Sequence, residues 1–171
     1  MPISVPAGQD PLVPLAGFNF HVSFARAGFA PTAGLPDEVT GAFSEVTGLE
    51  ATMEPKTIRD GGRNYGVLQR VGPVTFSTVI LKRGVIEARH LWAWWALFTG
   101  ADLSANGNWQ ATSRCDVTIA LLRGRTPVVA WTLENAMPTR YRAGDLNART
   151  GEIAIEELHL VHEGLHAEPT T

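Results

Sequence analysis

The sequence predicts a mainly β protein, an antiparallel sandwich or barrel with one packed α-helix. Several short segments alternate apolar and polar residues, which is the pattern of half-buried strands. One segment, residues 87–98, instead carries the spacing of an amphipathic helix. The strands come in runs before and after this helix, and this order disfavours a parallel α/β sheet. With 171 residues, the chain is long enough for a single domain with its own core.

The N-terminal half begins with an arm and continues with short strands. Residues 1–16 hold four prolines, so we expect a flexible arm there, one domain over 17–166 and a tail over 167–171. Apolar and polar residues alternate over 18–24 and predict the first strand. The segments that follow are a loop at 27–41, strands at 42–49 and 51–58, a turn at 60–62 and a strand at 74–81.

The predicted helix has one apolar stripe at positions i, i+3, i+4 and i+7, formed by Leu91, Trp94, Trp95 and Phe98. We expect this stripe to pack in the core, and Gly100 to end the helix in a left-handed conformation. Trp92 lies roughly 100° from the centre of the stripe. Tryptophan is enriched where proteins meet, so Trp92 is either an interface residue or a partly buried one.

After a polar loop at 104–113, the chain returns to strands. A hairpin is expected from strands at 115–122 and 128–134, followed by a short strand at 139–142 and a last strand at 152–162. In the last strand, Ile153 and Ile155 have one parity while Leu158 and Leu160 have the other. This switch predicts a β-bulge near Glu156 and Glu157.

Composition narrows the function classes. Charged residues make up 18% of the chain, below the roughly 25% of typical soluble domains, which indicates a surface that meets other protein. The net charge of -3 without a basic block argues against sequence-specific nucleic-acid binding. The start lacks the features of a signal peptide, and no apolar run reaches the roughly 20 residues of a membrane helix, so no membrane anchor is expected. Cys115, the one cysteine, is expected to be a small buried hydrophobe.

The stretch His162-Glu163-Gly164-Leu165-His166 has the form H-E-x-x-H, the signature of a zinc metallopeptidase. That chemistry needs a helix, which places both histidines on one face, and a third protein ligand. Here the preceding residues have a strand pattern, Gly164 lies inside the motif, and only five residues follow it. We therefore expect the end of a strand and no zinc. The sequence predicts no catalytic, metal-binding or cofactor-binding residues.

Several segments, in order along the chain, resemble the tail tube protein family of contractile phages and phage-tail-like contractile injection systems. They are GAFSEVTGLE (41–50), IRDGG (58–62), ILKRGV (80–85) followed by Leu91-Trp92, WTLENAMP (131–138), LNA (146–148) and IAIEELHLVHEGL (153–165). No single segment is specific, but their shared order covers about residues 17–165.

The resemblance implies a structural subunit of an inner tube and no enzyme. Such subunits form homo-hexameric rings, in which the sheet continues from one subunit to the next around a lumen. The rings stack into a tube inside a sheath, above baseplate and spike proteins. The protein would be made in the cytoplasm and assembled in a phage tail or phage-tail-like particle. Residues 25–41 look longer than the family's compact hairpin, so a tube-initiating baseplate protein of the same family stays an alternative.

The segment 54–65 is the candidate contact between subunits. It is long, contains glycine and mixes both signs of charge, which suits a polar contact that sets orientation. With Trp92, the candidate residues are Glu54, Arg59, Asp60 and Arg63. The alternatives are a solvated turn at this segment and, for the whole chain, a ligand-binding β-sandwich. The latter would expose aromatic residues on strands or loops, whereas Trp92, Trp94 and Trp95 lie in the predicted helix.

Overall fold

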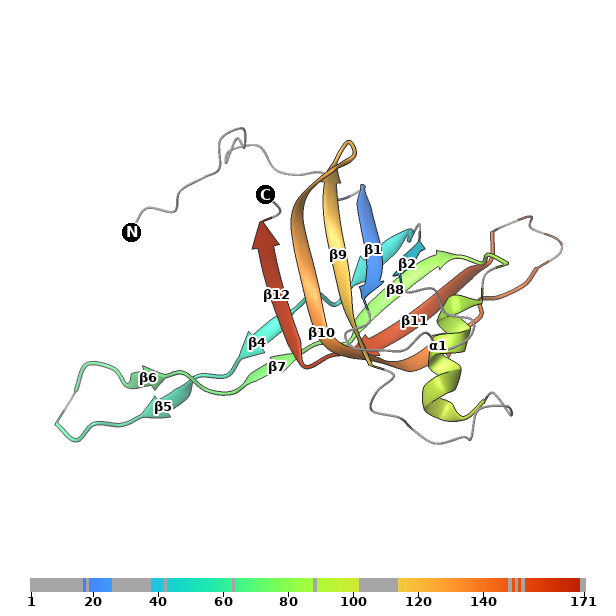
Figure 1. Ribbon diagram of the computed structural model, residues 1–171. Helices are drawn as coiled ribbons and strands as arrows, with labels where there is room; N and C mark the ends of the chain where they lie inside the picture. Colours follow the sequence, from blue (N-terminus) through green and yellow to red (C-terminus); the bar gives the residue numbers. More distant parts are fainter. Residues whose placement is uncertain are drawn as a thin grey trace.

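The computed structural model describes residues 17, 19–25, 38–41, 43–62, 64–87, 89–101, 114–147, 149, 151 and 153–169. These residues form twelve strands and one helix, and the paired strands are antiparallel, which confirms the predicted fold class (Figure 1). The N-terminal arm expected at 1–16 and the loop expected at 104–113 lie outside the described residues. The described part contains no helix that is both long and apolar enough to cross a membrane.

One large sheet forms the body of the protein. Its strands are β1 (Phe20–Ala25), β2 (Glu38–Gly41), β3 (Glu45–Thr47), β8 (Val79–Gly84), β9 (Cys115–Arg123), β10 (Thr126–Arg142), β11 (Ile155–Val161) and β12 (Gly164–Pro169). Their order is β2-β1-β9-β10-β11-β8-β3, and β12 also pairs with β10.

The long strand β10 belongs to two parts of this sheet. Its N-terminal part pairs with β9 and, over Val129–Glu134, with β12. Its C-terminal part, from Met137 to Arg142, pairs with β11. Between the two parts the pairing with β9 shifts register, and Asn135 takes a positive φ of 49°. The bend makes one half-sheet of β2-β1-β9-β10-β12 and a second of β10-β11-β8-β3.

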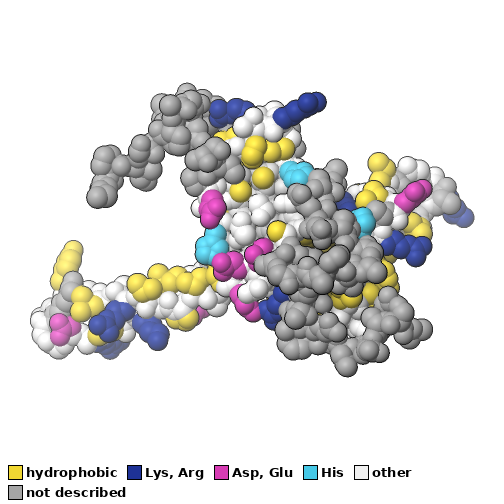
Figure 2. Space-filling model, in the orientation of Figure 1, with side chains coloured by type: hydrophobic (Ala, Val, Ile, Leu, Met, Phe, Trp, Pro, Cys, Tyr) yellow, Lys and Arg dark blue, Asp and Glu magenta, His cyan; other side chains and the backbone are white. Residues whose placement is uncertain are grey.

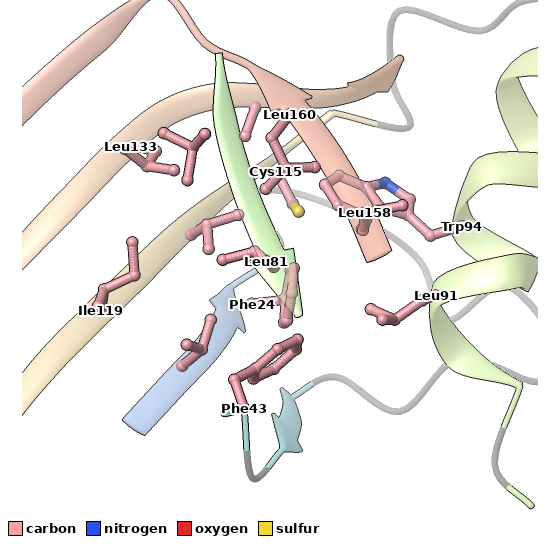
Figure 3. Packing of buried hydrophobic residues seen from close by; sticks show 14 residues of the cluster. Phe24, Phe43, Leu81, Leu91, Trp94, Cys115, Ile119, Leu133, Leu158 and Leu160 are labelled. Atoms are coloured by element: carbon pink, nitrogen blue, oxygen red, sulfur yellow. The ribbon is translucent and has the colours of Figure 1, made fainter. Parts of the chain in front are cut away.

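The core lies where side chains of the two half-sheets and the helix meet (Figure 3). Many of the core side chains come from strands in which inward-facing and outward-facing residues alternate strictly. Every second residue of β8, β9 and β11 is buried. Val22, Leu81, Val117, Leu133 and Leu158 are fully buried within this cluster. Cys115 is buried as expected and packs among these side chains. Because such positions are close-packed, the alternation fixes which face of each strand points inward.

Helix α1 (His90–Thr99) packs against β10 and closes one side of the core. Leu91 and Trp94 are buried, whereas Trp95 and Phe98 are only half-buried, so half of the predicted stripe lies at the margin of the core. Ala96, outside that stripe, is buried instead. Gly100 ends the helix at φ 67°, and its N–H donates to the Ala96 carbonyl at 3.0 Å, which confirms the predicted left-handed cap.

A two-stranded ribbon over residues 51–76, called the arm below, projects from the body (Figure 1). It consists of β4 (Ala51–Met53) paired with β7 (Val74–Phe76), and of β5 (Lys56–Ile58) paired with β6 (Leu68–Arg70). The predicted strand at 51–58 is thus two strands, and the one at 74–81 is divided at Ser77 and Thr78. The sequence predicted neither β6 nor β12, nor β2 within the loop at 27–41.

The bulge predicted near Glu156 and Glu157 is wrong. Strand β11 pairs with β8 in unbroken register from Ile155 opposite Gly84 to Leu160 opposite Val79. The parity of the isoleucines differs because they lie on the exposed face, while Glu156 occupies a buried position beside Arg83. The inward-facing position 156 therefore holds a charged residue, paired with Arg83, where the pattern predicts an apolar one.

Candidate assembly interface

The arm exposes almost its whole length. All residues of β4, β5 and β6 are exposed, and the tip residue Tyr65 is 93% exposed. Large apolar side chains stand out along the ribbon beside basic ones (Figure 2). They are Met53, Ile58, Tyr65, Val67, Leu68, Val71 and Val74. An isolated two-stranded ribbon is at best marginally stable in water. An exposed apolar ribbon of this kind is typical of a segment that packs against another protein surface.

Local sequence shapes the arm at its middle. Three residues separate β6 from β7, but only two separate β4 from β5, so the two sides are out of step by one residue. Gly72 lies in the longer side, and a Cβ there would lie 1.7 Å from the Glu54 carbonyl oxygen. Its N–H donates to Met53 Sδ at 3.4 Å. Only glycine permits this close approach of the two strands.

The structure gathers three of the five candidate contact residues. Glu54, Arg59 and Asp60 lie on the arm and are exposed. Arg63 lies outside the described residues. Trp92 is on α1, on the other side of the body from the arm, so it does not share a site with the charged residues (Figure 1).

Trp92 is the exposed member of an aromatic group on α1. Its side chain is 41% exposed, and its ring centroid lies 5.2 Å from that of Trp95 and 5.4 Å from that of Tyr141. The contact with Tyr141 is edge-to-face. The group therefore connects the helix to β10 while leaving the Trp92 side chain partly exposed.

The first half-sheet has two ends among the described strands, β12 and β2. At the β12 end, Gly164 lies opposite Glu134 of β10, and a Cβ at Gly164 would lie 2.4 Å from the Glu134 carboxylate oxygen Oε2. His166 Nε2 lies 3.1 Å from Glu134 Oε1 across the same pair of strands. A terminal strand presents backbone groups to any chain that extends the sheet.

A buried polar cluster holds the second half-sheet. Arg83 Nε lies 2.5 Å from Glu156 Oε1, and both residues are buried. The Tyr141 hydroxyl donates to Glu156 Oε2 at 2.8 Å. The Arg83 guanidinium also lies 5.6 Å from the centre of the Phe43 ring. The cluster thus joins β8, β10 and β11. Of these strands, β8 follows the arm in the chain, and β10 contacts helix α1.

The Tyr141 hydroxyl gives this cluster a pH dependence. Burial, and then the hydrogen bond to Glu156, raise the pKa of Tyr141 from its ordinary value of 10.0 to about 12. A raised folded-state pKa gives stability that is complete below the unfolded-state value and is lost as the pH rises through the folded-state value. Unfolding midpoints of the protein should therefore fall between about pH 10 and 12 more steeply than those of Tyr141→Phe. Parallel curves for the two proteins would contradict this coupling.

The H-E-x-x-H stretch spans the junction of two strands. His162 follows β11, and Gly164 to His166 begin β12, so the two histidines do not share a helix face. His162 Nδ1 lies 2.8 Å from the Gly164 carbonyl oxygen, and its ring lies against Phe76 at 5.0 Å. Among the described residues, no three or more His, Cys, Asp and Glu side chains form a group that could hold a metal ion. The motif therefore marks the bend between β11 and β12.

A second exposed apolar surface was missed by sequence reasoning. It lies at the ends of β8 and β11 and in the connection that follows β10, and is called the distal end below. Its residues are Val85, Ile86, Leu146, Ile153 and Ile155. In the sequence, the parity of Ile153 and Ile155 is the signal for this surface, and the bulge predicted from it is wrong.

Comparison with known proteins places this fold among contractile systems. A chain in the cryo-EM structure of the anti-feeding prophage baseplate matches with a TM-score of 0.70 and 27% identity, over 91% of this chain and 96% of that chain. A chain of the sheath-tube complex of the extracellular contractile injection system PVC gives 0.69 and 21%, over 94% and 95%. A chain of the anti-feeding prophage tube-terminating cap gives 0.68 and 20%, over 99% and 97%. No curated protein matches the chain significantly.

The fold and the projecting arm define a structural component of contractile tails and related particles. The family model of the T4-like virus tail tube protein gp19 matches residues 16–166. The chain belongs to this tail tube protein family.

Proposed function

We propose that six copies of this protein form a ring and that the rings stack into the inner tube of a contractile tail or injection system. In the ring, the β12 end of one subunit pairs with the β2 end of the next, so that the first half-sheet continues around a lumen. Such closure leaves no free sheet edge. The domain that builds the tube spans residues 17–166.

The arm is the observation that carries the proposal. At about 3.3 Å per residue, an extended strand from Ala51 to Asp60 is roughly 30 Å long, far more than a surface turn requires. The large apolar side chains that stand out along it are between 36% and 93% exposed within the described subunit. Stacking one ring on another covers them, while the exposed charges of Glu54, Arg59 and Asp60 set the orientation.

The partners follow from this role. The outer surface of the tube meets a sheath protein, and its ends meet baseplate and spike proteins. The protein acts without catalysis or cofactor and binds no specific nucleic-acid sequence. It is produced in the cytoplasm of the cell that assembles the particle.

Replacing Arg59 and Arg63 together by Glu tests the role of the arm. The variant should keep the circular dichroism spectrum and melting temperature of the wild type but form tubes at least several-fold shorter in electron micrographs. The defect should weaken as salt rises, because exposed charges are screened over roughly 8–10 Å at physiological ionic strength. Arg123→Glu with Arg125→Glu, at the β9–β10 turn, is the matched control and should leave tube length unchanged. Normal tubes from the arm variant would show that its charges do not direct stacking.

A tube-initiating baseplate protein is the second candidate. The likeness at 27% identity to a chain in the anti-feeding prophage baseplate favours it. The two functions differ in what the pure protein assembles, since a main tube subunit stacks without limit and an initiator stops at a single ring.

A further inference from the structure

The large apolar side chains that are most exposed are divided between two ends of the molecule. Tyr65 is 93% and Val71 82% exposed on the arm, while Leu146 is 86% and Ile153 78% exposed at the distal end. Other exposed large apolar residues among those described reach at most 51%. Apolar side chains gather on the arm and at the opposite end of the body (Figure 2). Two such concentrations on one chain indicate two contact surfaces.

Strand β8 fixes the positions of these surfaces relative to each other. The arm joins the body through β7, which is connected by Ser77 and Thr78 to the N-terminal end of β8 at Val79. The distal end begins where β8 ends, at Gly84, and a Cβ on Gly84 would lie 3.4 Å from Ile153 Cγ2. Val85 N–H also donates to the Ala154 carbonyl at 2.9 Å. The arm and the distal end therefore lie at opposite ends of one continuous strand (Figure 1).

The connection between β10 and β11 is held in place at the distal end. Gly144 has a φ of 73°, and a Cβ there would lie 2.2 Å from the Ile155 carbonyl oxygen. Arg142 bridges Asp145 at 2.7 Å and Glu157 at 3.3 Å. These contacts bring the two flanks of the connection together, with Leu146 on one flank and Ile153 on the other. Their exposure is therefore a feature of a backbone that is fixed on both sides.

We propose that the distal end of one subunit receives the arm of a second copy in the neighbouring ring. This inference rests on the proposed stacking of rings and names the receiving surface, which includes Val85, Ile86, Leu146, Ile153 and Ile155. Each subunit then carries one donor and one acceptor at opposite ends, which is the requirement for a head-to-tail contact that repeats without limit. A contact between two arms would stop at a pair of rings and would leave the distal end uncovered.

Disulfide cross-linking tests the contact. In a Cys115→Ala background, Tyr65→Cys or Val71→Cys is combined with Leu146→Cys or Ile153→Cys, and tubes are oxidised and separated under denaturing, non-reducing conditions. Cysteines form a disulfide only when their Cα atoms lie within about 7 Å, so the panel of four pairs samples the geometry of the contact. The substituted side chains are exposed, so the fold should be unchanged. At least one pair should give a ladder of covalent dimers, trimers and longer species.

Control variants distinguish a specific contact between the arm and the distal end from cross-linking that tube formation alone would give. The pairs Tyr65→Cys with Arg125→Cys and Val71→Cys with Arg125→Cys should give at least about tenfold less product, because only cysteines held as neighbours react at high effective concentration. Mixing proteins with only the arm cysteine and only the distal cysteine should give a covalent dimer with one chain of each kind. Dimers from Tyr65→Cys alone would overturn the inference in favour of contact between arms. Tubes visible by microscopy without a ladder from any pair would overturn it and leave the proposed function intact, whereas absence of rings in the unaltered protein, also after addition of its baseplate partners, would refute both.

Discussion

Glu156→Ala is expected to lower the free energy of unfolding by about 3–5 kcal/mol. The substitution removes the carboxylate that lies 2.5 Å from Arg83 Nε, and it leaves the guanidinium buried between the strands. It also removes the acceptor of the Tyr141 hydroxyl. Breaking a buried ion pair by removing one partner is far more costly than losing a surface pair.

The matched control removes both charges. Arg83→Met combined with Glu156→Leu replaces the pair by apolar side chains, and this double variant should regain most of the stability that Glu156→Ala loses. Denaturant melts of the three proteins give the comparison. A loss below about 0.5 kcal/mol for Glu156→Ala would place the pair at the surface and contradict the described core.

Removal of the arm is expected to abolish tubes without unfolding the subunit. Replacing residues 54–73 by Asn-Gly joins β4 to β7 through a two-residue turn and keeps Met53 opposite Val74. None of the described residues in the segment that is lost is buried, so the melting temperature should change little. Single rings should persist, because the arm is not part of the first half-sheet.

Electron microscopy and thermal melts measure the two parts of this prediction. Rings without tubes, with a melting temperature near that of the wild type, are the expected result. Tubes of normal length from the shortened protein would show that stacking uses another surface. A strongly lowered melting temperature would show instead that the arm stabilises the body.

The predictable parts of the fold are those that alternation and capping specify locally. Val22 and Phe24 alternate with polar neighbours, and in β1 both are buried, while His21 and Ser23 are only partly buried. The run from Cys115 to Leu122 does the same in β9. Gly100 ends the helix because a left-handed residue satisfies its last carbonyl groups. Each of these features depends on a few neighbouring residues only.

The unpredicted parts depend on residues that are distant in sequence. Strand β6 contains Gln69 and Arg70 and has no apolar alternation, and it forms because β5 lies opposite it. Strand β12 continues past the bend at His162 because β10 is long enough to pair with both β11 and β12. Glu156 broke the inward-facing pattern because its counter-ion, Arg83, is on another strand. No local pattern carries that information.

The candidate interface was predictable only in part for the same reason. Mixed charge and glycine indicated the segment 54–65, and the structure extends it to an arm over residues 51–76. The position of Trp92, away from the arm, required the packing of α1 on β10. The distal end required the pairing of β8 with β11, which brings Val85 and Ile153 to the same end of the sheet.

Negative-stain electron microscopy of the purified, unaltered protein at high concentration, with native mass spectrometry of the same sample, tests the tube-building role most directly. Six-fold rings that stack into tubes are expected, with a smallest stable species of six chains of 18.5 kDa each, about 111 kDa in total. A protein that stays an 18.5-kDa monomer at every concentration, also after addition of its baseplate partners, would contradict the proposed function.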